Sequence, residues 1–129
     1  MEISGKFSLA MKSIESYVES VEGIKFARKS IDKVFQGGLS ATSKGEMLNI
    51  LSPKLGSGGY VAIEIVTGEL DGKNGSFALQ HFGTMSSEHL NLILEVVRDS
   101  GTGELNNLKG NMYLNMEGEQ HNYTFAYEV

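Results

Sequence analysis

Cysteine is absent from this 129-residue chain, and proline occurs only once, at Pro53. The lack of cysteine excludes a disulfide framework, a thiol nucleophile and a cysteine-ligated zinc or iron–sulfur site. The sequence also has no run of about 18 consecutive apolar residues, the length that spans a bilayer as a helix. Its first residues carry no basic segment followed by an apolar run, so we expect neither secretion nor membrane insertion, but a cytoplasmic protein.

Basic residues are also few. The chain has 11 lysine and arginine side chains against 16 aspartate and glutamate side chains, which gives a net charge of -5. An acidic protein of this kind repels polyphosphate instead of attracting it. We therefore expect no nucleic-acid partner and no membrane partner.

Glycine, in contrast, is abundant, with 16 residues spread along the chain. Disordered glycine-rich chains generally carry proline and few aromatic or β-branched residues, whereas here the glycines separate short apolar runs. This distribution is typical of turns between strands. A chain of this length buries roughly two-thirds of its unfolded surface, which suits one domain covering residues 1–129.

Alternating apolar and polar residues predict strands along most of the sequence. The predicted strands cover residues 3–11, 24–37, 45–51, 60–70, 75–83, 90–97, 111–116 and 121–129. Because the connections are short, we expect antiparallel order. About eight such strands predict an all-β fold, a closed barrel wide enough to be filled by side chains or one small ligand.

Some segments stay ambiguous at this level. Residues 13–22 fit one face of a helix as well as an extended strand. The alternation breaks near Ser30, where we expect a bulge. The sequence Thr-Gly-Glu-Leu occurs at residues 67–70 and again at residues 102–105, which indicates two hairpins built to one plan.

The clearest hairpin has its turn at residues 71–74. If Asp71 pairs with Ser76 across that turn, Glu64 lies diagonally from His81 on the same face of the sheet. A buried carboxylate and imidazole shift each other's pKa values and can serve as general acid or base. The alternatives are that His81 is an ordinary core histidine, or that a bulge at Gly68 separates the two groups.

Motifs of this chain resemble those of an uncharacterised bacterial family. The similar segments are Gly75-Ser76-Phe77-Ala78-Leu79-Gln80-His81, Ser100-Gly101-Thr102-Gly103-Glu104-Leu105, Leu108-Lys109-Gly110, Phe35-Gln36-Gly37 and Tyr123 to Tyr127. The resemblance covers nearly the whole chain and implies an allene oxide cyclase-like, lipocalin-like barrel without an assigned reaction. The family pattern has an arginine after Glu64, where this chain has Ile65.

Apolar residues occupy both faces of the middle strands. In the predicted register, Ile63, Ile65 and Phe82 lie on the face opposite to Leu70 and Phe77. A barrel wall in water is expected to be polar outside, so these outer faces predict a homo-oligomer, a dimer or trimer.

Three functional hypotheses follow. The first is a barrel that binds a small apolar or amphipathic ligand. The second is an enzyme of the cyclase or isomerase type that uses Glu64 and His81, and the third is a non-catalytic oligomeric scaffold. Neither a cofactor nor a metal is expected, because no two of the three histidines have metal-ligand spacing. The candidate ligand-binding residues are Glu64, Gln80, His81, Glu104, Tyr123 and Tyr127.

Overall fold

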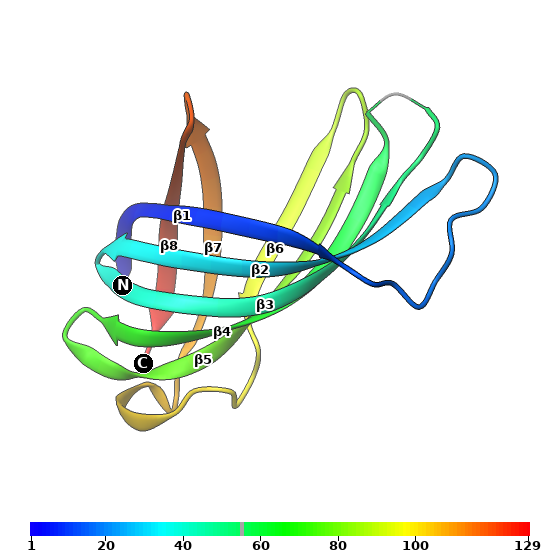
Figure 1. The fold of residues 1–129 in the computed structure, drawn as a ribbon. Helices are drawn as coiled ribbons and strands as arrows, with labels where there is room; N and C mark the ends of the chain where they lie inside the picture. Colours follow the sequence, from blue (N-terminus) through cyan, green and yellow to red (C-terminus); the bar gives the residue numbers. More distant parts are fainter. Residues whose placement is uncertain (55) are drawn as a thin grey trace.

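The computed structural model describes residues 1–54 and 56–129, and eight antiparallel strands close into a barrel (Figure 1). Each strand pairs with its neighbour in the chain, and the last strand returns to pair with the first. The strands are β1 (Glu2–Ile14), β2 (Lys25–Gly37), β3 (Leu39–Leu51), β4 (Gly58–Leu70), β5 (Lys73–Met85), β6 (Leu90–Val96), β7 (Lys109–Glu117) and β8 (Gln120–Glu128). The predicted closed antiparallel barrel is confirmed.

A membrane-crossing helix, long and apolar enough for that role, is not found in the described part of the chain. The described part contains a single short 3-10 helix, η1 (Gly103–Leu105).

Two local predictions need correction or completion. The ambiguous residues 13–22 contain no helix: β1 ends at Ile14, and a loop follows up to a bridge between Val21 and Ile24. The bulge predicted near Ser30 is wrong, because β2 pairs without interruption through that residue. The alternation breaks there because Lys29, on the inner face of β2, lies in a half-buried position where a charged side chain is tolerated.

The hairpin between β4 and β5 turns more tightly than predicted. Asp71 and Gly72 both have positive φ, 47° and 86°, and form a two-residue turn that pairs Leu70 with Lys73. The predicted pairing of Asp71 with Ser76 is therefore wrong. The observed register differs from the predicted one by an even number of residues, so every side chain stays on its predicted face of the sheet.

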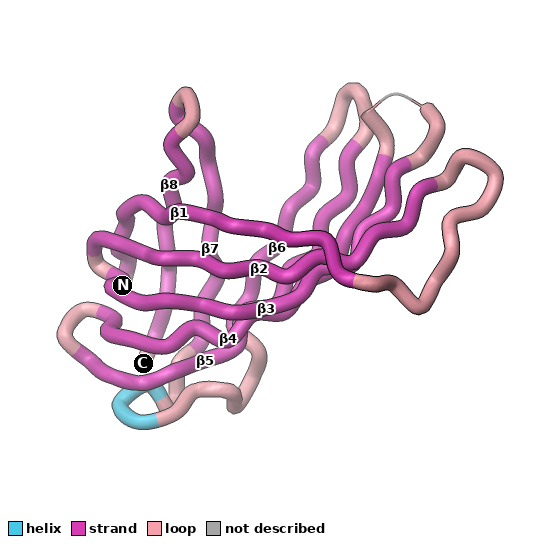
Figure 2. Tube along the Cα trace, viewed as in Figure 1, coloured by secondary structure: helices cyan, strands magenta, loops and turns pink. Residues whose placement is uncertain are grey.

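The repeated Thr-Gly-Glu-Leu sequence does not form a second hairpin, since residues 102–105 include η1 instead. This segment docks on β5: the Thr102 amide donates to the Ser76 carbonyl oxygen at 2.8 Å, and the Ser76 amide donates to the Thr102 hydroxyl at 3.1 Å. Leu105 and Leu108 are buried in the barrel interior. Residues 97–108 thus form a plug across one end of the barrel, the lower end in Figure 2.

The end of the barrel next to the plug is the hydrophobic core. Phe77 stacks on Phe125 with ring centroids 5.8 Å apart, and Phe125 stacks on Tyr127 at 5.3 Å. Further fully buried side chains there are Phe35, Leu39, Val66, Leu70, Leu79, Leu105 and Tyr123. We call this half of the barrel the closed end.

The opposite half of the barrel is open. Strands β6 and β7 pair at only two positions, Leu94 with Met112 and Glu95 with Asn111, and separate beyond them (Figure 1). Side chains that turn inward there are only partly buried, among them Leu9, Leu92 and Leu114. We call this half the open end.

We expect Tyr123→Phe to lower the free energy of unfolding by about 1–3 kcal/mol, the usual cost of leaving buried polar groups without partners. The Tyr123 hydroxyl accepts a hydrogen bond from the Leu39 amide at 3.0 Å and donates to the Gln36 carbonyl oxygen at 2.8 Å. Urea titration measures the change. Tyr113→Phe, at a 60% exposed position, is the control, and equal effects of the two substitutions would contradict the role given to Tyr123.

Candidate functional site

Four polar side chains meet inside the barrel, between the closed end and the open end. Lys33 comes from β2, Ser43 from β3, Glu64 from β4 and His81 from β5. All four are buried, and the Glu64 side chain is fully buried. Charged groups at such depth are rare unless they are paired, so their contacts define what this cluster can do.

The Glu64 carboxylate lies at the centre of the cluster. Lys33 Nζ donates to Glu64 Oε2 at 2.8 Å, and the Ser43 hydroxyl donates to Oε1 at 2.7 Å. His81 Nε2 lies 2.5 Å from the same Oε2 atom, and the Tyr60 hydroxyl lies 3.2 Å from His81 Nδ1. We call these five residues the Glu64 network.

The strand register brings these residues together. Lys33 is directly opposite Ser43, while Glu64 is opposite Gly45 on β3 and diagonal to His81 on β5. A Cβ atom at Gly45 would lie 2.7 Å from the Glu64 Cβ atom, far inside van der Waals contact. Glycine at this position therefore lets β3 approach the β4 backbone closely at Glu64.

The surroundings keep Glu64 ionised. Burial raises the pKa of its carboxyl group, but the hydrogen bond from His81 and the charge and hydrogen bond of Lys33 outweigh burial and lower the pKa to about 2. The Lys33 ammonium also faces two aromatic rings, 5.1 Å from the centroid of Phe7 and 5.7 Å from that of Phe35. These rings give the cation favourable contacts without water.

The ionised carboxylate also sets the direction of the remaining hydrogen bonds. A carboxylate only accepts, so His81 Nε2 carries a proton and donates to Glu64. In the neutral imidazole, Nδ1 is then an acceptor, and the Tyr60 hydroxyl donates to it. Burial and the nearby Glu64 charge raise the pKa of Tyr60 to about 12, so its hydroxyl keeps its proton at neutral pH.

The structure brings together two of the residues predicted as ligand-binding, Glu64 and His81, and separates the other four from them. Gln80 is exposed on the outer face of β5, because it alternates with His81 along the strand. Glu104 is exposed on η1, where its Oε1 atom accepts a hydrogen bond from the Asn74 amide at 3.0 Å. Neither side chain turns into the barrel beside Glu64 and His81.

The two predicted tyrosines do face inward, but at the closed end. Tyr123 and Tyr127 are buried in the hydrophobic core, and the Tyr127 hydroxyl lies 3.5 Å from Asp71 Oδ2. Burial raises the pKa of both tyrosines. Neither residue contacts the Glu64 network directly through a hydrogen bond.

Sequence reasoning missed Lys33, Ser43 and Tyr60. A signal for Lys33 was available, since it lies midway between Ile31 and Phe35 on the apolar, inward face of β2. A lysine at a core position requires an acid partner, and Glu64 is the one fully buried acid among the described residues.

Metal binding has no support among the described residues, where no group of three or more histidine, cysteine, aspartate or glutamate side chains comes together. The Glu64 network supplies one carboxylate and one imidazole. What it can do is orient a polar group, or hold and move a proton along the series Glu64, His81 and Tyr60.

We expect Glu64→Gln to destabilise the protein at pH 7, because it leaves the buried Lys33 cation without its anion. The pKa of Glu64 is about 2 in the folded state and 4.5 without interactions, so its ionisation stabilises the fold above pH 4.5. That contribution, of the order of 3 kcal/mol, is lost as the pH falls from 4.5 towards 2. Urea unfolding measures the free energy of unfolding of the unmodified protein and of the Glu64→Gln variant. The difference between these two free energies should shrink as the pH falls through this range.

Glu69→Gln is the matched control, because Glu69 lies on the same strand with its side chain exposed. Its unfolding free energy should follow that of the unmodified protein at every pH. A Glu64→Gln difference that stays constant between pH 6 and pH 2.5 would contradict the ionised state of Glu64.

Comparisons with known proteins agree with the architecture. The family model described as "Protein of unknown function (DUF3224)" matches residues 3–127. A protein of unknown function from the DUF3224 family, from Shewanella oneidensis MR-1, has 44% sequence identity with this chain. Its crystal structure matches the fold of this chain with a TM-score of 0.98. The similarity covers 100% of this chain and 96% of that one. No curated protein matches. The chain belongs to the DUF3224 family, whose function is unknown.

Proposed function

We propose that this protein binds a small, largely apolar molecule at the open end of the barrel, next to the Glu64 network. One observation carries the proposal: the series Glu64, His81 and Tyr60 leads from a fully buried carboxylate to a half-buried hydroxyl on the inner face. Polar groups of this kind orient ligands in otherwise apolar sites. The proposed location is the cytoplasm, because a cysteine-free chain suits a reducing compartment.

Apolar side chains at the open end suit an apolar ligand. Six leucine and methionine side chains face inward at the open end, beside polar ones such as Lys29: Leu9, Met11, Met47, Leu92, Leu114 and Met116. They are half-buried or exposed, so apolar surface remains for a ligand to cover. Methionine side chains are flexible and polarizable, and they adapt to ligands of irregular shape.

The polar groups indicate what the ligand carries. With His81 neutral, the Tyr60 hydroxyl donates a hydrogen bond to Nδ1, so the Tyr60 oxygen offers a lone pair to a ligand donor. Asn49 lies opposite Tyr60 on β3, and its buried Oδ1 atom has no hydrogen-bond partner in the described structure. A buried acceptor without a donor is costly, and a ligand hydroxyl or amine would satisfy it. The proposed ligand is therefore an apolar molecule with one hydrogen-bond donor.

A second candidate function, proton transfer to or from the bound molecule, is favoured by the order of the network. Carboxylate, imidazole and hydroxyl follow one another as in sites where a carboxylate orients a histidine that acts on a hydroxyl. Here Glu64 orients His81, and Tyr60 is the group nearest to the open end. In this role the Tyr60 oxygen accepts a proton from the bound molecule while its own proton passes to His81 Nδ1, and the Glu64 carboxylate stabilises the imidazolium that forms.

Ligand binding predicts that the fluorescent probe N-phenyl-1-naphthylamine, an apolar molecule with one N–H donor, binds to the unmodified protein. Met116→Glu should weaken this binding about tenfold or more, because it places a charge on the inner face of β7 where the apolar body would lie. Fluorescence titration measures the dissociation constants.

Tyr113→Glu is the control for this titration, because Tyr113 lies on the same strand with its side chain turned outward and 60% exposed. It should leave the affinity unchanged. An equal loss of probe affinity in Met116→Glu and Tyr113→Glu would contradict a site at the open end. So would the absence of saturable probe binding to the unmodified protein.

Proton transfer predicts that neutral His81 carries its proton on Nε2, with Nδ1 free to accept from Tyr60. Nitrogen-15 NMR of the histidine ring distinguishes the two tautomers. Tyr60→Phe should then shift the Nδ1 resonance while leaving the proton on Nε2, because the carboxylate still accepts it. A proton found on Nδ1 in the unmodified protein would exclude this relay.

A further inference from the structure

A continuous apolar surface covers the outside of the barrel over β3–β6. The residues on it alternate with the inward-facing ones and are Leu48, Val61, Ile63, Ile65, Phe82 and Ile93. Each is between 40% and 60% exposed. We call these six residues the apolar outer face. Because they contribute little to the core, the fold itself does not account for them.

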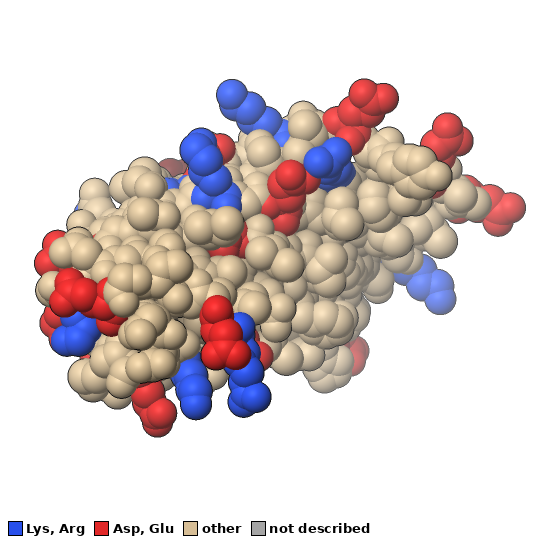
Figure 3. All heavy atoms as spheres, turned by 90° about the horizontal axis from the view of Figure 1, so that it is seen from below, with Lys and Arg blue, Asp and Glu red and all other residues tan. Residues whose placement is uncertain are grey.

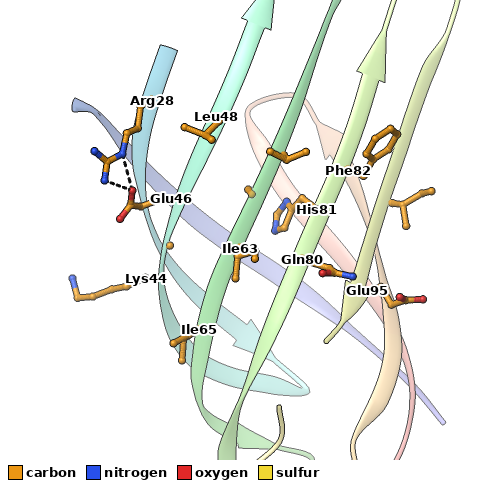
Figure 4. A pocket seen from close by; sticks show the side chains of 14 residues that line it. Arg28, Lys44, Glu46, Leu48, Ile63, Ile65, Gln80, His81, Phe82 and Glu95 are labelled. Atoms are coloured by element: carbon orange, nitrogen blue, oxygen red, sulfur yellow. Dashed lines mark hydrogen bonds and ion pairs between the residues drawn. The ribbon is translucent and has the colours of Figure 1, made fainter. Parts of the chain in front are cut away.

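The strand register makes this surface contiguous. Leu48 pairs with Val61, Val61 with Phe82 and Phe82 with Ile93, so one row of apolar side chains crosses four strands. Ile63 and Ile65 follow on β4 in the next two rows. A groove of about 810 Å³ runs over this surface and contains all six residues (Figure 4).

The size of the surface fits a protein–protein contact. Six large side chains, each with roughly half of about 200 Å² exposed, present on the order of 600 Å² of apolar surface. That is the upper end of what monomeric proteins leave uncovered. With a polar rim, it approaches the roughly 800 Å² per partner of a stable interface.

Charged side chains border the apolar outer face on both sides. Lys44 and Glu46 lie on β3, where Lys44 pairs with Asp32 and Glu46 pairs with Arg28, and Glu95 lies on β6 (Figure 4). In the view of Figure 3, acidic and basic side chains lie in small groups, with broad uncharged areas between them. A two-fold axis parallel to the strands would exchange the β3 side with the β6 side, so Leu48 of one copy would meet the partner's Ile93 and Val61 would meet the partner's Phe82.

We propose that the apolar outer face is the contact between two copies of this chain. A two-fold axis between β4 and β5, parallel to the strands, packs the row of Leu48, Val61, Phe82 and Ile93 against the same row of the partner. The surface is thus complementary to itself. A lipid surface fits less well, because the acidic chain and the Glu46 and Glu95 carboxylates on the rim oppose anionic headgroups. This inference does not depend on the proposed ligand.

Sedimentation equilibrium of the full chain at micromolar concentration tests the proposal. We expect a particle of twice the 14.0 kDa chain mass. Ile63→Lys should raise the dimer dissociation constant at least 100-fold, because it buries a charge at the centre of the contact. Val34→Lys is the matched control: Val34 is also outward-facing on a strand, 47% exposed, and lies outside the apolar outer face.

A pair of introduced charges tests the predicted symmetry. Leu48→Lys and Ile93→Glu should each weaken the dimer about tenfold, because each places a charge in the apolar contact, whereas the two charges together meet across the two-fold axis. The double variant, and an equimolar mixture of the two single variants, should both recover the dimer. Circular dichroism confirms that each variant is folded.

The result that would overturn the proposal is a 14.0 kDa particle for the unmodified chain, or a dimer that Ile63→Lys does not weaken relative to Val34→Lys. A dimer weakened by Ile63→Lys but not recovered when Leu48→Lys and Ile93→Glu are combined would overturn the two-fold arrangement. Binding to lipid vesicles by a chain that stays monomeric would assign the surface to a membrane instead.

Discussion

The buried ion pair between Lys33 and Glu64 constrains the rest of the structure. A carboxylate without water must be met by donors, and these come from three other strands, with Lys33 on β2, Ser43 on β3 and His81 on β5. If any of these strands slipped by one residue, its donor would turn to the outside of the barrel. The network therefore fixes the mutual register of four strands, and it places the Tyr60 hydroxyl towards the open end as part of the same arrangement.

The two proposed interactions use opposite faces of the same strands. Along β4, Glu64 points inward between Ile63 and Ile65, which point outward. Because side chains alternate, the Glu64 network and the six residues of the apolar outer face share strands but no side chains, although His81 also lines the groove over that face. The two surfaces can therefore be altered separately, and loss of one need not imply loss of the other.

Alternation of apolar and polar residues predicted the barrel because it shows which side of each strand is buried. The buried side remains correct even where the predicted strand pairing is wrong by an even number of residues. Glu64 and His81 were placed on one face despite a wrong register, since the hairpin slipped by an even number of residues. Lys33 was missed because one charged residue in an apolar series interrupts the pattern that identifies the core. Thr-Gly-Glu-Leu at residues 102–105 was misassigned because docking on β5, which sequence alone does not report, selects η1 there.

The order of the strands has a consequence for how the barrel folds. All strand pairings but one join neighbours in the chain, so the sheet can grow hairpin by hairpin with short loops to close. The exception joins β1 to β8, residues more than a hundred positions apart, such as Glu2 and Ala126. Closing that seam carries the largest entropic cost of any pairing, so the transition from an open curled sheet to a cylinder is expected to limit the rate of folding.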